Sequence, residues 1–384
     1  MGKRITLGIV FNYDENWIGG TYYFQYLIQS LNLLEDDQKP NIVIVSNQIS
    51  SFKLIKELNY PYLTYQNSQI KKNLLERLID KINRILNPKA IIQNKKIDFG
   101  IDILFRPSEI IVPNKILKHL FWIPDFQEMY LPNLFSENYL AHRKKTQIAL
   151  LGPDKHVLFS SQDALKDFKK QYPTAQTNCF VVPFSVFHPD FSSINFENLK
   201  AKFKLDSNIE YFFSPNQFWK HKNHIIVLKA IKLLKHNSAK KIIVLFSGKE
   251  SDHRNPTYFD ELKEYIKINE LEENVKFLGF IDRKEQLCFM KNAIAIIQPS
   301  LFEGWSSVVE DAKSLNKNII ASSLGVHKEQ LETNAYFFDP LNEVELSEHL
   351  NYFLENKVVD PNYNYKQNLN KFGLDFLNVI RKIV

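Results

Sequence analysis

Short apolar runs alternate with amphipathic segments along most of the chain, and this alternation restricts the folds that it can adopt. The first half has five such runs, each short enough for one strand: 5–11, 42–45, 101–105, 119–123 and 157–160. Segments with helical periodicity lie between them, such as 21–34 and 70–86. Apolar strands that alternate with helices are typical of a parallel sheet covered on both faces. The pattern therefore predicts a doubly wound α/β domain.

The alternation pauses near residues 181–183 and then starts again, and a chain of 384 residues is too long for one ordinary core. Helical patterns then separate six further apolar runs, at 211–214, 242–246, 275–278, 293–298, 318–321 and 335–338. The intervening segment 184–198 is irregular and rich in Ser, Asn and Pro, as expected of a linker. We expect one domain over 1–190, a second over 191–365 and a helix over 366–384. Ligands should bind at the carboxyl ends of the strands, in a cleft between the domains.

Charge and cysteine content restrict the partners and the compartment. The formal net charge of +6 favours anionic partners, such as nucleotide phosphates, an anionic membrane surface or nucleic acid. Cys179 and Cys288 are too few for a disulfide framework or a zinc site, which indicates a reducing compartment. We see no secretory signal and no run near the ~20 apolar residues of a membrane-spanning helix. We therefore expect a cytoplasmic protein.

The segment 293–315 predicts a strand, a tight loop and a helix that Ser306 or Ser307 can cap. Glu303 and Glu310 lie seven positions apart, which is two helical turns or about 10 Å. Carboxylates accept hydrogen bonds from paired hydroxyls, and a helix N-terminus attracts phosphates. A nucleotide diphosphate-sugar offers hydroxyl groups on both sides of a diphosphate. The alternative is a surface helix with two solvated acids.

This segment resembles the E-x7-E signature of the retaining GT-B glycosyltransferases of family 4, also called group 1. The resemblance implies two doubly wound, Rossmann-like domains with an interdomain cleft, and a C-terminal helix that crosses back to the first domain. It implies that Glu310 holds the ribose and that Glu303 orients the sugar. It adds further donor-binding positions at Gly304, Trp305, Ser306 and Ser307.

A second segment, 214–224, resembles the family's donor loop in its N-Q-F-W-x-H-K-N-H form. Lys222 matches the lysine of the family's basic pair, and its charge can offset the negative charge of a departing phosphate. Gln217 stands where the family commonly has arginine, so it can bind phosphate without neutralising it. With Asn216, these residues are expected to bind the donor. The alternative is an ordinary basic helix N-terminus.

Two further segments follow strands of the first domain. Gly19 and Gly20 open a helix, and they resemble the family's glycine loop beside the phosphates, although a glycine pair is often only a turn. Many members of the family carry His-Asp after a later strand, where this chain has Pro124 and Asp125. Asp125 therefore inherits the candidate polar role. Its alternative is a helix cap or an Asx-turn.

The resemblance implies a retaining enzyme that moves a sugar from a nucleotide-sugar donor to a saccharide or lipid-linked acceptor. Bacterial surface polysaccharide or glycoconjugate synthesis is the expected setting. Asp125, Lys222 and Glu303 are the expected catalytic residues. No D-x-D triplet occurs, so we expect neither a metal nor another cofactor.

Other functions remain as alternatives, namely a GT-B sugar epimerase and a two-lobed solute-binding protein. A phosphorylase would need a pyridoxal lysine and a much longer chain. The basic segment 71–96 is interpreted first as a solvated amphipathic helix, and contact with the inner face of the membrane is the minority interpretation. We expect no nucleic-acid partner.

Overall fold

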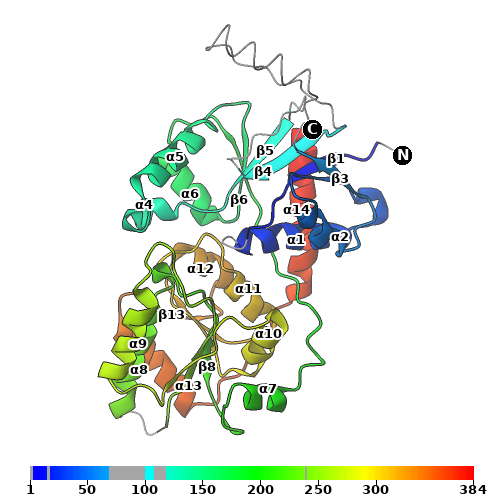
Figure 1. The fold of residues 1–384 in the computed structure, drawn as a ribbon. Coiled ribbons are helices and arrows are strands. Elements are labelled where there is room, and N and C mark those ends of the chain that lie inside the picture. Colours follow the sequence, from blue (N-terminus) through cyan, green and yellow to red (C-terminus); the bar gives the residue numbers. More distant parts are fainter. Residues whose placement is uncertain (1–2, 15–17, 69–99, 108–117, 238–239) are drawn as a thin grey trace, which may run out of the picture.

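The computed structural model describes residues 3–14, 18–68, 100–107, 118–237 and 240–384. The chain forms two α/β domains, one above the other in Figure 1, each built on a parallel sheet. The predicted helix 70–86 and the basic segment 71–96 lie outside the described residues. Among the described helices, none is long and apolar enough to cross a membrane.

The first sheet has seven strands in the order β3-β2-β1-β4-β5-β6-β7. Its strands are β1 (Thr6–Val10), β2 (Asn41–Ser46), β3 (Leu63–Asn67), β4 (Ile103–Pro107), β5 (Lys118–Ile123), β6 (His156–Phe159) and β7 (Asn178–Val181). Its helices are α1 (Ile18–Asn32), α2 (Ile49–Lys56), α4 (Gln127–Tyr130), α5 (Glu137–Ile148) and α6 (Gln162–Gln171). The five apolar runs predicted as strands correspond to β1, β2, β4, β5 and β6.

The two edge strands, β3 and β7, are absent from the sequence-based prediction. Neither strand contains a fully buried residue, because each has a neighbouring strand on one side only. Polar residues such as Gln66 and Asn178 therefore occur within them, and the apolar run that marks a central strand is missing.

The second sheet has six strands in the order β10-β9-β8-β11-β12-β13. They are β8 (Phe212–Ser214), β9 (Val244–Phe246), β10 (Val275–Phe277), β11 (Ile296–Gln298), β12 (Ile319–Ser322) and β13 (Tyr336–Phe338). Its helices are α7 (Phe196–Lys202), α8 (His224–Asn237), α9 (Tyr258–Ile268), α10 (Arg283–Asn292), α11 (Ser307–Ser314), α12 (Gly325–Leu331) and α13 (Glu343–Glu355). The two doubly wound domains confirm the predicted fold class.

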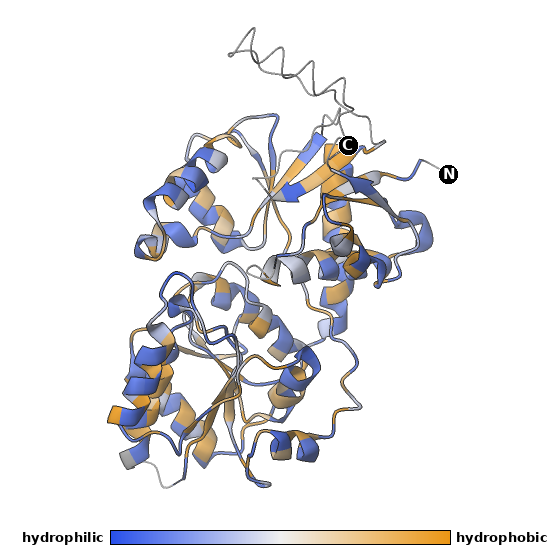
Figure 2. Cartoon of the chain, in the orientation of Figure 1, coloured by the Kyte–Doolittle hydropathy of each residue, from blue (hydrophilic) through white to orange (hydrophobic). Residues whose placement is uncertain are grey.

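The long helix α14 (Tyr365–Ile383) follows the second domain but packs against the first, beside α1 (Figure 1). Phe372, Phe376 and Ile380 form its buried stripe and belong to the hydrophobic core of the first domain. Figure 2 shows hydrophobic residues in α14 and in the strands next to it. A Cβ on Gly373 would lie 2.7 Å from the backbone oxygen of Ser30, so the close approach of α14 to α1 requires glycine.

The strand order determines where a ligand can bind. The order reverses between β1 and β4 in the first sheet and between β8 and β11 in the second. Ligands of doubly wound sheets bind outside the carboxyl ends of the strands at such a reversal. The loops after β8 and β11, and the start of α1, are therefore the expected walls of a site.

Candidate active site

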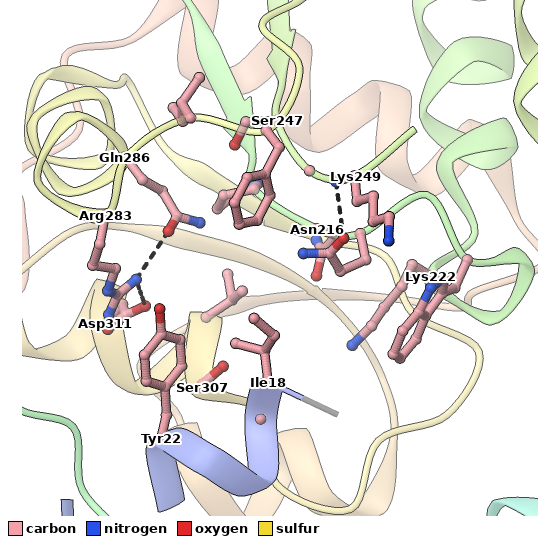
Figure 3. Close-up of a pocket in the computed structure, with 18 of the residues that line it drawn as sticks. Ile18, Tyr22, Asn216, Lys222, Ser247, Lys249, Arg283, Gln286, Ser307 and Asp311 are labelled. Atoms are coloured by element: carbon pink, nitrogen blue, oxygen red, sulfur yellow. Dashed lines mark hydrogen bonds and ion pairs between the residues drawn. The ribbon is translucent and has the colours of Figure 1, made fainter. Parts of the chain in front are cut away.

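A cavity of about 730 Å³ lies between the two domains (Figure 3). The first domain contributes the start of α1, with Ile18, Gly19 and Tyr22. The second domain contributes the loops after β8, β9 and β10 and the N-terminus of α11. The cavity therefore occupies the position that the strand order predicts, and both domains must be in place to enclose it.

Lys222 and Glu303 form an ion pair at this site. Lys222 Nζ lies 2.6 Å from Glu303 Oε1, and the two side chains are only 16% and 9% exposed. Gln298 and Ser300 donate further hydrogen bonds to the same oxygen, at 2.8 and 2.6 Å. Burial acts to raise the pKa of Glu303, but Lys222 and the Ser300 hydroxyl lower it overall, so the carboxylate is ionised. Lys222 lines the cavity and Glu303 lies behind it.

The loop after β8 is fixed by its own side chains. Asn216 donates to Gln298 Oε1 at 3.0 Å, which links the loop to β11. Asn223 adopts the left-handed conformation, with φ of 56°, directly after the short helix η4 (Lys220–Lys222). Its side chain donates to the carbonyl oxygens of Pro299 and Pro340. Asparagine tolerates this conformation better than most residues. Asn223 therefore holds the turn that directly follows Lys222.

The structure does not support the predicted ribose contact of Glu310. Its side chain is buried away from the cavity, where Lys313, Gln330 and Tyr365 donate to it at 3.1, 3.0 and 2.7 Å. Tyr365 Oη in turn accepts from the backbone N–H of Val186 at 2.9 Å. Glu310 therefore joins α11 to both segments of chain that run between the domains.

Asp311, which was not predicted from the sequence, is the acidic residue of α11 that lines the cavity. Seven residues lie between Glu303 and Asp311, which is the spacing that E-x7-E specifies, whereas only six precede Glu310. Because successive helical residues differ in direction by about 100°, this shift of one position turns the carboxylate toward the cavity. Asp311 lines the cavity together with Ser307, at the N-terminus of α11.

Asp311 belongs to a buried charge network. Arg283 donates to both of its carboxylate oxygens, one of them at 2.7 Å, and His188 Nε2 lies 3.0 Å from Oδ1. Burial acts to raise the pKa of Asp311, but Arg283 and His188 lower it overall. Figure 3 shows Tyr22 of the first domain extending toward this pair.

Gly304 lies at a close approach of the two domains. A Cβ at this position would stand 2.5 Å from the carbonyl oxygen of Pro124 and 2.6 Å from Asp125 Cβ. The side chain of Trp305 turns to the first domain and donates to the Phe184 carbonyl at 2.9 Å, so the donor contact predicted for Trp305 would fall to its backbone. Ser306 caps α11 by accepting from Val309 N–H, as predicted for this position.

The first-domain residues lie beside these second-domain groups. Gly19 lines the cavity, with no atom within 4 Å of the position that a Cβ would take, whereas Gly20 is buried in α1. Asp125 accepts from Gln127 N–H at 3.2 Å, which is the Asx-turn that the sequence left as an alternative. Burial raises the pKa of Asp125, although Arg143 acts against this effect. In the described part of the chain, no three His, Cys, Asp or Glu side chains are placed to hold a metal ion.

Three buried histidines near the site predict a pH-dependent stability. Burial lowers the pKa of His221, His224 and His327, in the case of His224 to about 3. Below pH 6.5 the unfolded chain binds protons that the folded protein does not, so the free energy of unfolding falls. At pH 5 the neutral His224 alone should cost about 2 kcal/mol, and His221 and His327 act in the same direction.

Urea denaturation at pH 7 and pH 5 measures this effect. The variant His224→Phe keeps the aromatic contact with Phe218, whose ring centroid is 4.5 Å away, and removes one titrating group. It should lose about 2 kcal/mol less than the wild type between these two pH values. An equal loss in both proteins would contradict the assignment.

Comparisons with known proteins agree with this architecture. Residues 195–372 match the family model of glycosyl transferases group 1. The chain is 23% identical over 325 residues to the O-antigen chain mannosyltransferase RfbU of Salmonella typhimurium, covering 84% of each chain. A glycosyltransferase from Rickettsia africae superposes with a TM-score of 0.65 at 15% identity, over 100% of this chain and 94% of that one. Anabaena Alr3699/HepE, solved in complex with UDP and glucose, gives 0.63 at 14% identity, over 99% and 95%. These likenesses show the GT-B fold.

Proposed function

We propose that the protein is a group 1 glycosyltransferase that moves a sugar from a nucleotide-sugar donor to a saccharide or lipid-linked acceptor. The observation that carries the proposal is the interdomain cavity, where Lys222 and the N-terminus of α11 face one space at the strand reversal. A cation and free helical N–H groups suit a diphosphate. The match of residues 195–372 to the family model supports the same assignment.

Different residues of the site would bind the nucleotide and the sugar of the donor. Lys222 would offset the charge that grows on the leaving diphosphate, with the backbone around Gly19 on the opposite wall. Asp311, rather than Glu310, would accept a ribose hydroxyl, because each carboxylate oxygen can accept more than one hydrogen bond. Glu303 would orient the sugar next to Gly304. Asp125 would face the acceptor from the first domain.

We further propose a retaining, metal-independent reaction of family 4 type. The bond between C1 and the phosphate oxygen breaks, and the acceptor oxygen bonds to C1 on the same face of the sugar. The acceptor proton passes to the departing phosphate oxygen. RfbU is named as an O-antigen chain mannosyltransferase, which supports a role in bacterial surface polysaccharide or glycoconjugate synthesis. The expected cytoplasmic location and the contact with the membrane remain predictions from the sequence.

A turnover assay with nucleotide-sugars tests this function. The wild-type protein should release nucleoside diphosphate from one of the UDP-, GDP- or ADP-sugars when an acceptor is present, and EDTA should leave the rate unchanged. The product should keep the anomeric configuration of the donor, which NMR reports. Interconversion of the donor sugar without transfer would instead identify an epimerase. Inversion of the product, or loss of activity in EDTA, would contradict the retaining or metal-independent part.

A further inference from the structure

We propose that Lys249, in the loop after β9, supplies the free positive charge that binds the donor's diphosphate. The inference rests on the proposed function and deepens it, because it adds a donor-binding residue that neither the sequence motifs nor the comparisons indicate. Three lines of observation support it: the pairing of the other cations, the attachment of the loop, and the position of the side chain.

The other fixed cations of the cavity wall are each paired with a carboxylate. Lys222 is paired with Glu303 at 2.6 Å, and Arg283 is paired with both oxygens of Asp311. Lys249 is exposed and forms no ion pair with any other residue that the structure describes. A diphosphate diester carries about two negative charges, so Lys222, whose charge Glu303 partly offsets, does not balance it alone.

The backbone of Lys249 is held firmly against the donor loop. Gln217 Oε1 accepts from Lys249 N–H at 2.8 Å. The preceding Gly248 has φ of +154°, and a Cβ there would stand 2.3 Å from the carbonyl oxygen of Asn216. The close contact between these two loops therefore requires glycine at position 248, and it fixes the position of the Lys249 backbone.

This attachment also explains the glutamine at position 217. A guanidinium has no acceptor atom and could not receive the Lys249 N–H, whereas the glutamine carbonyl does so. Gln217 therefore does not supply a charge itself but positions the residue that does.

The side chain lies where a diphosphate bound between Lys222 and α11 would need it. Lys249 and Lys222 both line the cavity. Figure 3 shows them on one side of the cavity, with Arg283 and Asp311 on the opposite side. Of the two acids that line the cavity, Asp311 is paired with Arg283, and Asp282 caps α10 by accepting from Lys284 N–H at 2.8 Å. A lysine ammonium on a flexible stem can follow the phosphate as it leaves the sugar.

Calorimetry with three variants tests the inference, using whichever of UDP, GDP and ADP binds the wild type. Lys249→Gln should weaken nucleoside diphosphate binding about tenfold or more, since one charge-assisted contact is lost. It should leave the affinity for the matching nucleoside within about twofold, because the nucleoside lacks phosphates. Lys249→Arg should retain most of the diphosphate affinity. Lys267→Gln removes an exposed lysine from the last turn of α9, outside the cavity, and should match the wild type.

The outcomes separate the inference from the function on which it rests. Diphosphate binding by Lys249→Gln within twofold of the wild type would overturn the role of Lys249 and leave the proposed function in place. Equal losses for nucleoside and nucleoside diphosphate would also overturn it, because they would indicate a disturbed loop rather than a lost charge. Failure of the wild type to bind any of the three diphosphates would overturn the proposed function itself.

Discussion

Replacing Lys222 with methionine is expected to lower turnover by about two to three orders of magnitude, the range found when one donor to a developing negative charge is removed. Methionine keeps the length of the side chain but cannot offset charge on a departing phosphate. The effect should fall on kcat more than on donor affinity, because the charge is greatest in the transition state. Steady-state kinetics with the donor identified by turnover measures both constants.

The design must separate this chemical role from the ion pair with Glu303. Lys222→Met alone leaves the Glu303 carboxylate without its cation, whereas Lys222→Met combined with Glu303→Gln removes both charges. If Lys222 acts on the leaving group, the double variant should recover thermal stability but should turn over more slowly than Glu303→Gln alone. Lys220→Met is the matched control, since Lys220 is exposed in the same short helix and does not line the cavity. Wild-type kcat in Lys222→Met would contradict the assignment.

Gly304→Ala is expected to lower turnover by about a hundredfold, because a small displacement of catalytic groups has this effect. The added Cβ would collide with Pro124 and Asp125 of the first domain, and one of these contacts is with backbone, which cannot rotate away. The second domain alone contains most of the cavity wall, so nucleotide affinity should change much less than kcat.

Solution scattering of the nucleotide complex shows whether the domains are displaced. Gly304→Ala should give a larger radius of gyration than the wild type. Gly152→Ala is the control, since its Cβ would meet only the flexible side chain of Asp154, at 3.1 Å, and Lys155. A wild-type kcat in Gly304→Ala would show that the close approach of the domains is not required for transfer.

The central strands were predictable from the sequence because they are buried on both faces. A short uninterrupted apolar run such as Val244–Phe246, bounded by helical patterns, favours a buried strand of a parallel sheet. Edge strands lack this constraint, which is why β3 and β7 were missed. The positions of the donor loop and of the helix α11 were predictable for the same reason, as both follow buried strands.

The site itself was predictable only in part, because its polar contacts join residues far apart in the chain. Glu303 was identified from its motif, but the pairing with Lys222 spans 81 positions and no local pattern shows it. Glu310 and Asp311 are adjacent and both acidic, so composition does not tell which one faces the cavity. The three partners of Glu310 decide this, and two of them, Gln330 and Tyr365, come from later segments.

The buried position of Glu310 explains how α11 is kept in place relative to the first domain. Tyr365 begins the helix that returns to the first domain, and Val186 lies on the outgoing segment. Tyr365 binds both Val186 and Glu310, and Trp305 binds the carbonyl of Phe184 nearby. Both crossings of the chain between the domains are therefore attached to the start of α11, which also lines the cavity.

Isothermal titration of the wild-type protein with UDP, GDP and ADP tests most directly whether the interdomain cavity is a donor site. The proposed function predicts that one of the three binds with a stoichiometry of one per chain. Ser307→Trp should abolish this binding, because the indole ring would fill the space at the N-terminus of α11. Position 307 is partly exposed, so the larger side chain should be compatible with the fold. Binding of none of the three at millimolar concentration, or equal binding by Ser307→Trp, would contradict the assignment of this cavity.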